Sequence, residues 1–150
     1  MPGQAASRRA GVLLHPTSLP GDGYTGDFGA DARRFIDSMA RSGLSVWQVL
    51  PIGPTHEDGC PYQSSSVHAG NPDLISLDWL AKHELLNDQQ AHVGRQSPAA
   101  KRTALDLASA AFFQRLFNAE DSLLVSAYSE FTEQAEFWLE DYVRFQAFRD

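Results

Sequence analysis

Two stretches decide the fold: GVLLHPTSLPG at residues 11–21 and VWQVLPIGPTHEDGCPYQSSSVHAGNP at residues 46–72. Each begins with an apolar run typical of a strand buried on both faces, and each continues into a loop rich in glycine and proline. A helical pattern lies between them and should end at Gly43. Its apolar positions are Ala32, Phe35, Ile36, Met39 and Ala40. The sequence therefore predicts strand, loop, helix, strand and loop.

This order is typical of a parallel βαβ crossover, because the helix returns the chain to the same edge of the sheet. Both loops should then lie on one rim, at the carboxyl ends of the strands. Connections in compact domains usually run about 4–6 residues, so the long second loop is expected to have a function.

The remainder of the chain reads as mainly helical. Residues 74–77 are predicted to be a short extended piece, followed by a helical turn through residue 86. Ser97 and Pro98 predict a helix start, and one apolar pattern runs from about residue 123 to the end. Since two parallel strands seldom stand alone, we expect an N-terminal piece of a larger protein. A small complete α+β domain is the alternative.

Composition narrows the function classes. The formal net charge is −7 and the pI is near 5.1, which argues against a nucleic-acid partner. No apolar run is long enough for a membrane span, and a single cysteine, Cys60, is consistent with a cytoplasmic location. We find no spacing typical of metal ligands and no nucleotide-binding pattern, so no metal or cofactor is expected.

Several short motifs together resemble the 4-α-glucanotransferases, also called amylomaltases or disproportionating enzymes. In order they are LLHPTSLPG (13–21), GDFG (26–29), WQVLPIGPT (47–55), PYQS (61–64) and AGNP (69–72), with WLEDY (138–142) further on. The resemblance implies an α/β fold, the N-terminal part of a (β/α)8 TIM barrel with an inserted helical subdomain. It divides the chain into an extension (1–10), the first βαβ unit with its substrate-side loop (11–77) and a helical insertion (78–150).

The resemblance also implies an activity: transfer of α-1,4-glucan segments between maltodextrins by a retaining double displacement. That chemistry uses two carboxyl groups about 5–5.5 Å apart. In this family they follow later strands, so no catalytic residue is assigned within these 150 residues, and the piece alone is predicted to be inactive. A non-catalytic α-glucan-binding module is the alternative function, and a pseudoenzyme scaffold is a third.

Four loop residues are candidates for substrate binding. Tyr62 is the strongest, because an aromatic ring complements the C–H face of a sugar; a buried loop anchor is its alternative role. Gln63 and Asn71 have amides that suit sugar hydroxyls, or that hold the loop through backbone contacts. Cys60 stands where relatives commonly have serine, which replaces a hydroxyl donor with a weak thiol. Its alternative role, as a nucleophile activated by His56 or His68, would need a fixed geometry.

Acidic loop residues offer no better catalyst. Asp27 is expected to cap the first helix, and Asp22 belongs to a Gly–Asp–Gly turn. Glu57 and Asp58 are neighbours in a loop, which does not place them across a glycosidic bond, and Asp73 has no partner acid in its motif.

Overall fold

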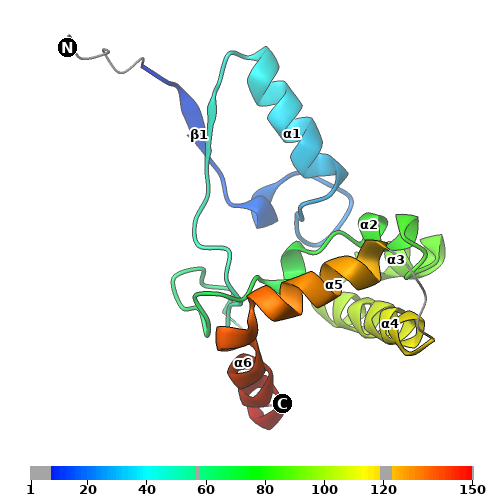
Figure 1. Cartoon of the computed structure of the whole chain (residues 1–150). Coiled ribbons are helices and arrows are strands. Elements are labelled where there is room, and N and C mark those ends of the chain that lie inside the picture. Colours follow the sequence, from blue (N-terminus) through cyan, green and yellow to red (C-terminus); the bar gives the residue numbers. More distant parts are fainter. Residues whose placement is uncertain (1–7, 57, 119–122, 150) are drawn as a thin grey trace.

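The computed structural model describes residues 8–56, 58–118 and 123–149. Figure 1 shows β1 and α1 at one end, the helices α2, α3 and α4 grouped together, and α5 leading into α6. The elements in chain order are β1 (Gly11–Leu13), the 3-10 turn η1 (Pro16–Ser18), α1 (Ala30–Arg41), β2 (Val46–Gln48), the 3-10 turn η2 (Pro72–Leu74), α2 (Leu77–Lys82), α3 (Asp88–Gly94), α4 (Pro98–Phe117), α5 (Leu123–Gln134) and α6 (Glu136–Arg149).

The two strands pair in parallel. Gly11 lies opposite Val46, and Leu13 lies opposite Gln48. A side chain at position 11 would overlap Val46, so the absence of a Cβ allows this close approach. The predicted parallel crossover is confirmed.

Helix α1 packs on this pair through Phe35, whose ring meets the Trp47 ring edge-on with centroids 5.0 Å apart. The helix ends at Arg41, and the predicted stop residue, Gly43, follows the C-cap Ser42 with a φ of 72° that glycine adopts without strain. At the other end, the Asp27 carboxylate accepts a hydrogen bond from the Gly29 N–H at 2.7 Å, while Gly29 itself is the N-cap residue. Asp27 thus stabilises the turn before the helix.

The expectation that β1 is buried on both faces is wrong for this structure. The Leu13 side chain is 58% exposed, and β1 has only partly buried or exposed residues. Among the described residues the sheet has no third strand, so two strands and one helix cannot enclose both faces. The (β/α)8 barrel stays a prediction.

The main hydrophobic core lies in the helical part. Its centre is Leu77, which is fully buried. The buried members of this core are Leu77, Leu80, Leu85, Leu86, Ala91, Ala104 and Ala108. The extended piece predicted at 74–77 is confined to Ile75 and Ser76, because η2 ends at Leu74 and the Ser76 hydroxyl then caps α2 by accepting from the Trp79 N–H.

Helix α4 begins as predicted. The Ser97 hydroxyl accepts from the Ala100 N–H at 3.2 Å, and Pro98 occupies the first turn. Helix α3 begins with a capping box between Asn87 and Gln90. At the end of α3, Gly94 leaves room for Leu77 and Ala104, which an added Cβ would meet at 2.6 and 2.8 Å.

The last apolar pattern forms two helices instead of the single helical pattern that we predicted. The Ala135 N–H closes α5 by donating to Phe131 O, and Ala135 O accepts from the Trp138 N–H at the start of α6. Figure 1 shows α6 leaving α5 at a sharp angle. Ala135 is 4% exposed, so the bend lies at a buried alanine and no glycine or proline marks it in the sequence. The boundaries proposed for an inserted subdomain stay a prediction.

Candidate functional site

The two glycine- and proline-rich loops leave the sheet at the same edge. The ladder extends to Leu14, whose N–H donates to Gln48 O at 3.0 Å, and the Trp47 indole N–H donates to Leu14 O at 2.8 Å. His15 then joins the loops: its Nε2 lies 3.3 Å from Pro51 O and its Nδ1 lies 2.7 Å from the Thr17 hydroxyl. Turns η1 and η2 are also in contact. The prediction that both loops share one rim is confirmed.

The second loop is closed at its base. The Asn71 N–H donates to Ile52 O at 2.9 Å, so the two ends of the loop lie side by side. Further out, Thr55 and Ser64 form an isolated antiparallel bridge. A long loop with joined ends is a compact Ω-like unit, a type that often carries function. We call the residues between the bridge partners, 56–63, the loop tip.

The tip is shaped by two tight turns. Gly59 has a φ of 66°, and the Asp58 carboxylate accepts from the Cys60 N–H at 3.0 Å. The Gln63 N–H then donates to Cys60 O at 3.1 Å. Tyr62 lies within this second turn, and its side chain is 73% exposed. The alternative role of Tyr62 as a buried anchor is therefore wrong, and its ring faces solvent on the rim.

The other predicted site residues lie in different environments. Gln63 is exposed, whereas Asn71 lies at the loop base and its Oδ1 accepts from the Asp73 N–H at 2.9 Å. Asn71 thus caps η2, as its structural alternative predicts. Cys60 is a half-buried free thiol. Contact of any of these side chains with substrate stays a prediction.

The nucleophile hypothesis for Cys60 gains no support from the described residues. His68 is occupied elsewhere: its ring stacks on Trp138 with centroids 5.6 Å apart and meets Phe137 edge-on at 5.2 Å. The part of the loop that returns from the tip to the base therefore packs against α6 through His68. This long-range contact has no signal in the local sequence.

Below the rim lies a polar network around the buried Lys101, which the sequence reasoning missed. Lys101 in α4 is only 3% exposed, and its ammonium donates a hydrogen bond to Asp73 O. The Tyr24 hydroxyl donates to the Asp73 carboxylate at 2.9 Å. A signal was present in the sequence, since Lys101 falls on the same helical face as the buried Ala104 and Ala108.

Burial perturbs the titration of this network. Loss of solvent raises the pKa of Asp27, and the nearby positive charge of Lys101 opposes that rise. Burial likewise lowers the pKa of Lys101, against the attraction of Asp27 and Asp73. Burial, with the hydrogen bond to Asp73, raises the pKa of Tyr24, so this side chain stays a neutral donor at physiological pH.

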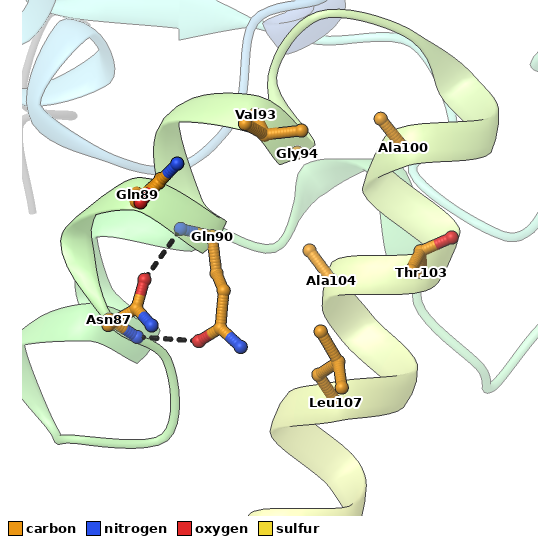
Figure 2. A pocket seen from close by; sticks show the side chains of 9 residues that line it. All are labelled: Asn87, Gln89, Gln90, Val93, Gly94, Ala100, Thr103, Ala104 and Leu107. Carbon is orange, nitrogen blue, oxygen red and sulfur yellow. Dashed lines mark hydrogen bonds between the residues drawn. The ribbon is translucent and has the colours of Figure 1, made fainter.

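Two cavities accompany these features. The first, of about 390 Å³, lies between α3 and α4, and Figure 2 shows Val93, Ala104 and Leu107 among the residues that line it. At its edge, the side-chain oxygens of Asn87 and Gln90 each accept from the other residue's backbone N–H at 2.8 Å, so both side chains are committed to capping α3. The second, of about 120 Å³, adjoins the polar network and is lined in part by Tyr24 and Lys101.

Three of the described acidic loop residues are engaged in hydrogen bonds. Asp27 and Asp58 each accept a local backbone hydrogen bond, and Asp73 accepts from Tyr24. Glu57 lies outside the described residues. Across residues 8–56, 58–118 and 123–149, no group of three histidine, cysteine or acidic side chains is arranged to hold a metal ion. None of the helices in those ranges is long and apolar enough to cross a membrane.

Comparison with known proteins places this site in a family. A family model described as 4-alpha-glucanotransferase matches residues 14–150. The 4-alpha-glucanotransferase of Thermus thermophilus is 40% identical over 148 residues, which is 95% of this chain and 29% of the relative. The Synechocystis enzyme of the same name is 38% identical over 95% of this chain and 30% of its own length.

Two further matches differ in kind. The chloroplastic/amyloplastic 4-alpha-glucanotransferase DPE1 of Arabidopsis thaliana is 52% identical over 86 residues, which cover 57% of this chain and 15% of the relative. Among solved structures, the amylomaltase from Streptococcus agalactiae in complex with acarbose matches 95% of this chain and 30% of its own chain, with a TM-score of 0.79 and 31% identity. The chain thus spans less than a third of the length of the relatives it matches, and by these matches it belongs to the 4-alpha-glucanotransferase family.

Proposed function

We propose that the protein to which this chain contributes transfers α-1,4-glucan segments between maltodextrins, and that the rim described above binds the sugar. The family supports this reaction, and the observation that carries the role of the rim is the exposure of Tyr62. A 73% exposed aromatic ring on a braced loop, at the carboxyl edge of parallel strands, presents a flat apolar face to the place where β/α folds bind substrate.

The proposed chemistry divides between this chain and the rest of the protein. A retaining transfer needs a carboxylate nucleophile and a second carboxyl group that serves as acid and then base. The family resemblance implies that both groups follow later strands, so we assign them to residues outside this chain. The role of the rim is to hold a glucose ring through Tyr62, with Gln63 and Asn71 as hydrogen-bonding groups.

The partners follow from the same proposal. We infer that maltodextrins are the substrates; acarbose, which the Streptococcus agalactiae relative binds in its structure, is a useful probe. The negative net charge suits a neutral glucan better than a nucleic acid. A cytoplasmic location stays a prediction.

Incubation of the protein from the complete reading frame with maltotriose tests the proposal. Transfer should yield glucose together with maltodextrins longer than the substrate. Release of glucose without longer products would indicate hydrolysis, and binding of acarbose without turnover would indicate a glucan-binding module. Either result would reject the proposed transfer.

A further inference from the structure

We propose that Lys101 is a positioning residue for the glucan-binding rim, acting through Asp73 on Asn71. This inference rests on the proposed function, because Asn71 is one of the residues assigned there to substrate. It concerns a helix that begins more than twenty residues after the loop ends, and neither the sequence motifs nor the family match gives this lysine a role.

The first observation concerns the free-energy cost of burying the Lys101 ammonium. Its side chain is 3% exposed, whereas the other lysine of the chain, Lys82, is exposed on α2. A buried ammonium is unfavourable unless hydrogen bonds and opposite charges compensate for the lost solvent. Here the compensation comes from the rim segment, through Asp73 O and the attraction of the Asp27 and Asp73 carboxylates.

The second observation is an unbroken set of hydrogen bonds from this ammonium to the loop base. Lys101 Nζ donates to Asp73 O, and the Asp73 N–H donates to Asn71 Oδ1 at 2.9 Å. The Asn71 N–H donates to Ile52 O at 2.9 Å. Displacement of Asp73 would therefore move both the amide of Asn71 and one end of the loop that carries Tyr62.

The third observation is that Asp73 is held from a second direction. The Tyr24 hydroxyl donates to its carboxylate at 2.9 Å, and Tyr24 belongs to the loop that follows β1. Asp73 is thus fixed by one group from the first loop and one from the helical part. Lys101 is the member that makes the position of the rim depend on α4.

The test compares Lys101→Met with the matched control Lys82→Met in the full-length protein. Lys101→Met keeps most of the side-chain volume and removes the donor and the charge. We expect faster amide hydrogen exchange at residues 73–75, whose N–H groups donate within this turn, and no such change in the control. Unchanged amide exchange in Lys101→Met would overturn the proposal, whatever the transfer activity of that variant.

Kinetics with maltotriose provide the second readout. Loss of one well-placed hydrogen bond to sugar should raise KM roughly three- to tenfold with little change in kcat. If Lys101 acts through Asn71, Lys101→Met should add less than about twofold to the KM of Asn71→Ala, because the two changes remove the same interaction. If the increases in KM from Lys101→Met and Asn71→Ala instead multiply in the double variant, the proposal is overturned. An equal rise in KM in the Lys82→Met control would also overturn it.

Two milder variants keep the test decisive if Lys101→Met does not fold. Lys101→Arg retains a cationic donor and should restore KM at least in part. Tyr24→Phe removes one oxygen from the other side of Asp73 and should speed exchange in the same segment; normal exchange in that variant would contradict the role given to Asp73. A wild-type protein that transfers no glucan would reject the proposed function, while the exchange measurement would still decide the role of Lys101.

Discussion

Replacement of Tyr62 by alanine should separate substrate binding from stability. The side chain is 73% exposed, so its removal breaks few contacts and should change the free energy of unfolding by less than about 0.5 kcal/mol. A sugar ring that covers one face of the tyrosine would bury roughly 70 Å² of apolar surface, worth ~2 kcal/mol at about 25 cal/mol per Å². The expected loss in kcat/KM is therefore about 30-fold.

The assay is transfer from maltotriose by the full-length protein, measured beside thermal unfolding of each variant. Tyr62→Phe keeps the ring, so kcat/KM should fall only roughly threefold, because this variant loses only the hydrogen bond of the hydroxyl. Val67→Ala is the matched control, because Val67 is 93% exposed on the same loop and has no assigned role. A Tyr62→Ala protein with kcat/KM within about twofold of wild type would refute the argument, and so would a large drop in its melting temperature.

Three further predictions concern the scaffold. Leu77→Ala removes the centre of the helical core and should cost about 3 kcal/mol in urea unfolding, whereas Leu123→Ala, at a 91% exposed position, should cost less than about 0.5 kcal/mol; equal costs would mean that the core lies elsewhere. Gly26→Ala places a methyl group against Pro16 O and 2.8 Å from Leu19 Cβ, so the free energy of unfolding should fall by about 1–3 kcal/mol and the melting temperature should fall with it. Gly70→Ala, whose added methyl group would point into open space, is the control and should leave stability unchanged. Asp27→Asn tests the raised pKa of Asp27. A carboxyl group whose pKa is raised on folding loses stability as pH rises from its unfolded pKa through its folded pKa, whereas asparagine does not titrate. The variant should therefore gain stability relative to wild type as pH rises through that window, and a pH-independent difference would contradict the assignment.

Local signals predicted the rim well because each acts over a few residues. Two apolar runs separated by one helical pattern allow a parallel crossover and little else, and this arrangement alone places the residues after Leu13 and after Gln48 at one edge. Gly43 and the Ser97–Pro98 pair marked helix ends for equally local reasons, a positive φ and a side-chain cap.

Errors arose where a distant neighbour outweighed a local preference. Residues 74–77 read as extended, yet only Ile75 and Ser76 are, because Ser76 caps a helix whose first residue, Leu77, is the most buried of the core. The single pattern through Ala135 became two helices, and the first turn of α6 packs against His68. Apolar periodicity reports which face is buried, but it does not report what the face is buried against.

By itself, therefore, the sequence determined the first strand–helix–strand order, the shared rim and the family, because hydrophobic period, turn residues and caps are properties of short segments. Only the tertiary structure decided that Lys101 is buried under Asp73, that Asn71 serves as a cap, and that Tyr62 stands free of the helices. The physical reason is that burial of a charge or an aromatic ring depends on groups brought together across the fold, and no spacing along the chain encodes that meeting.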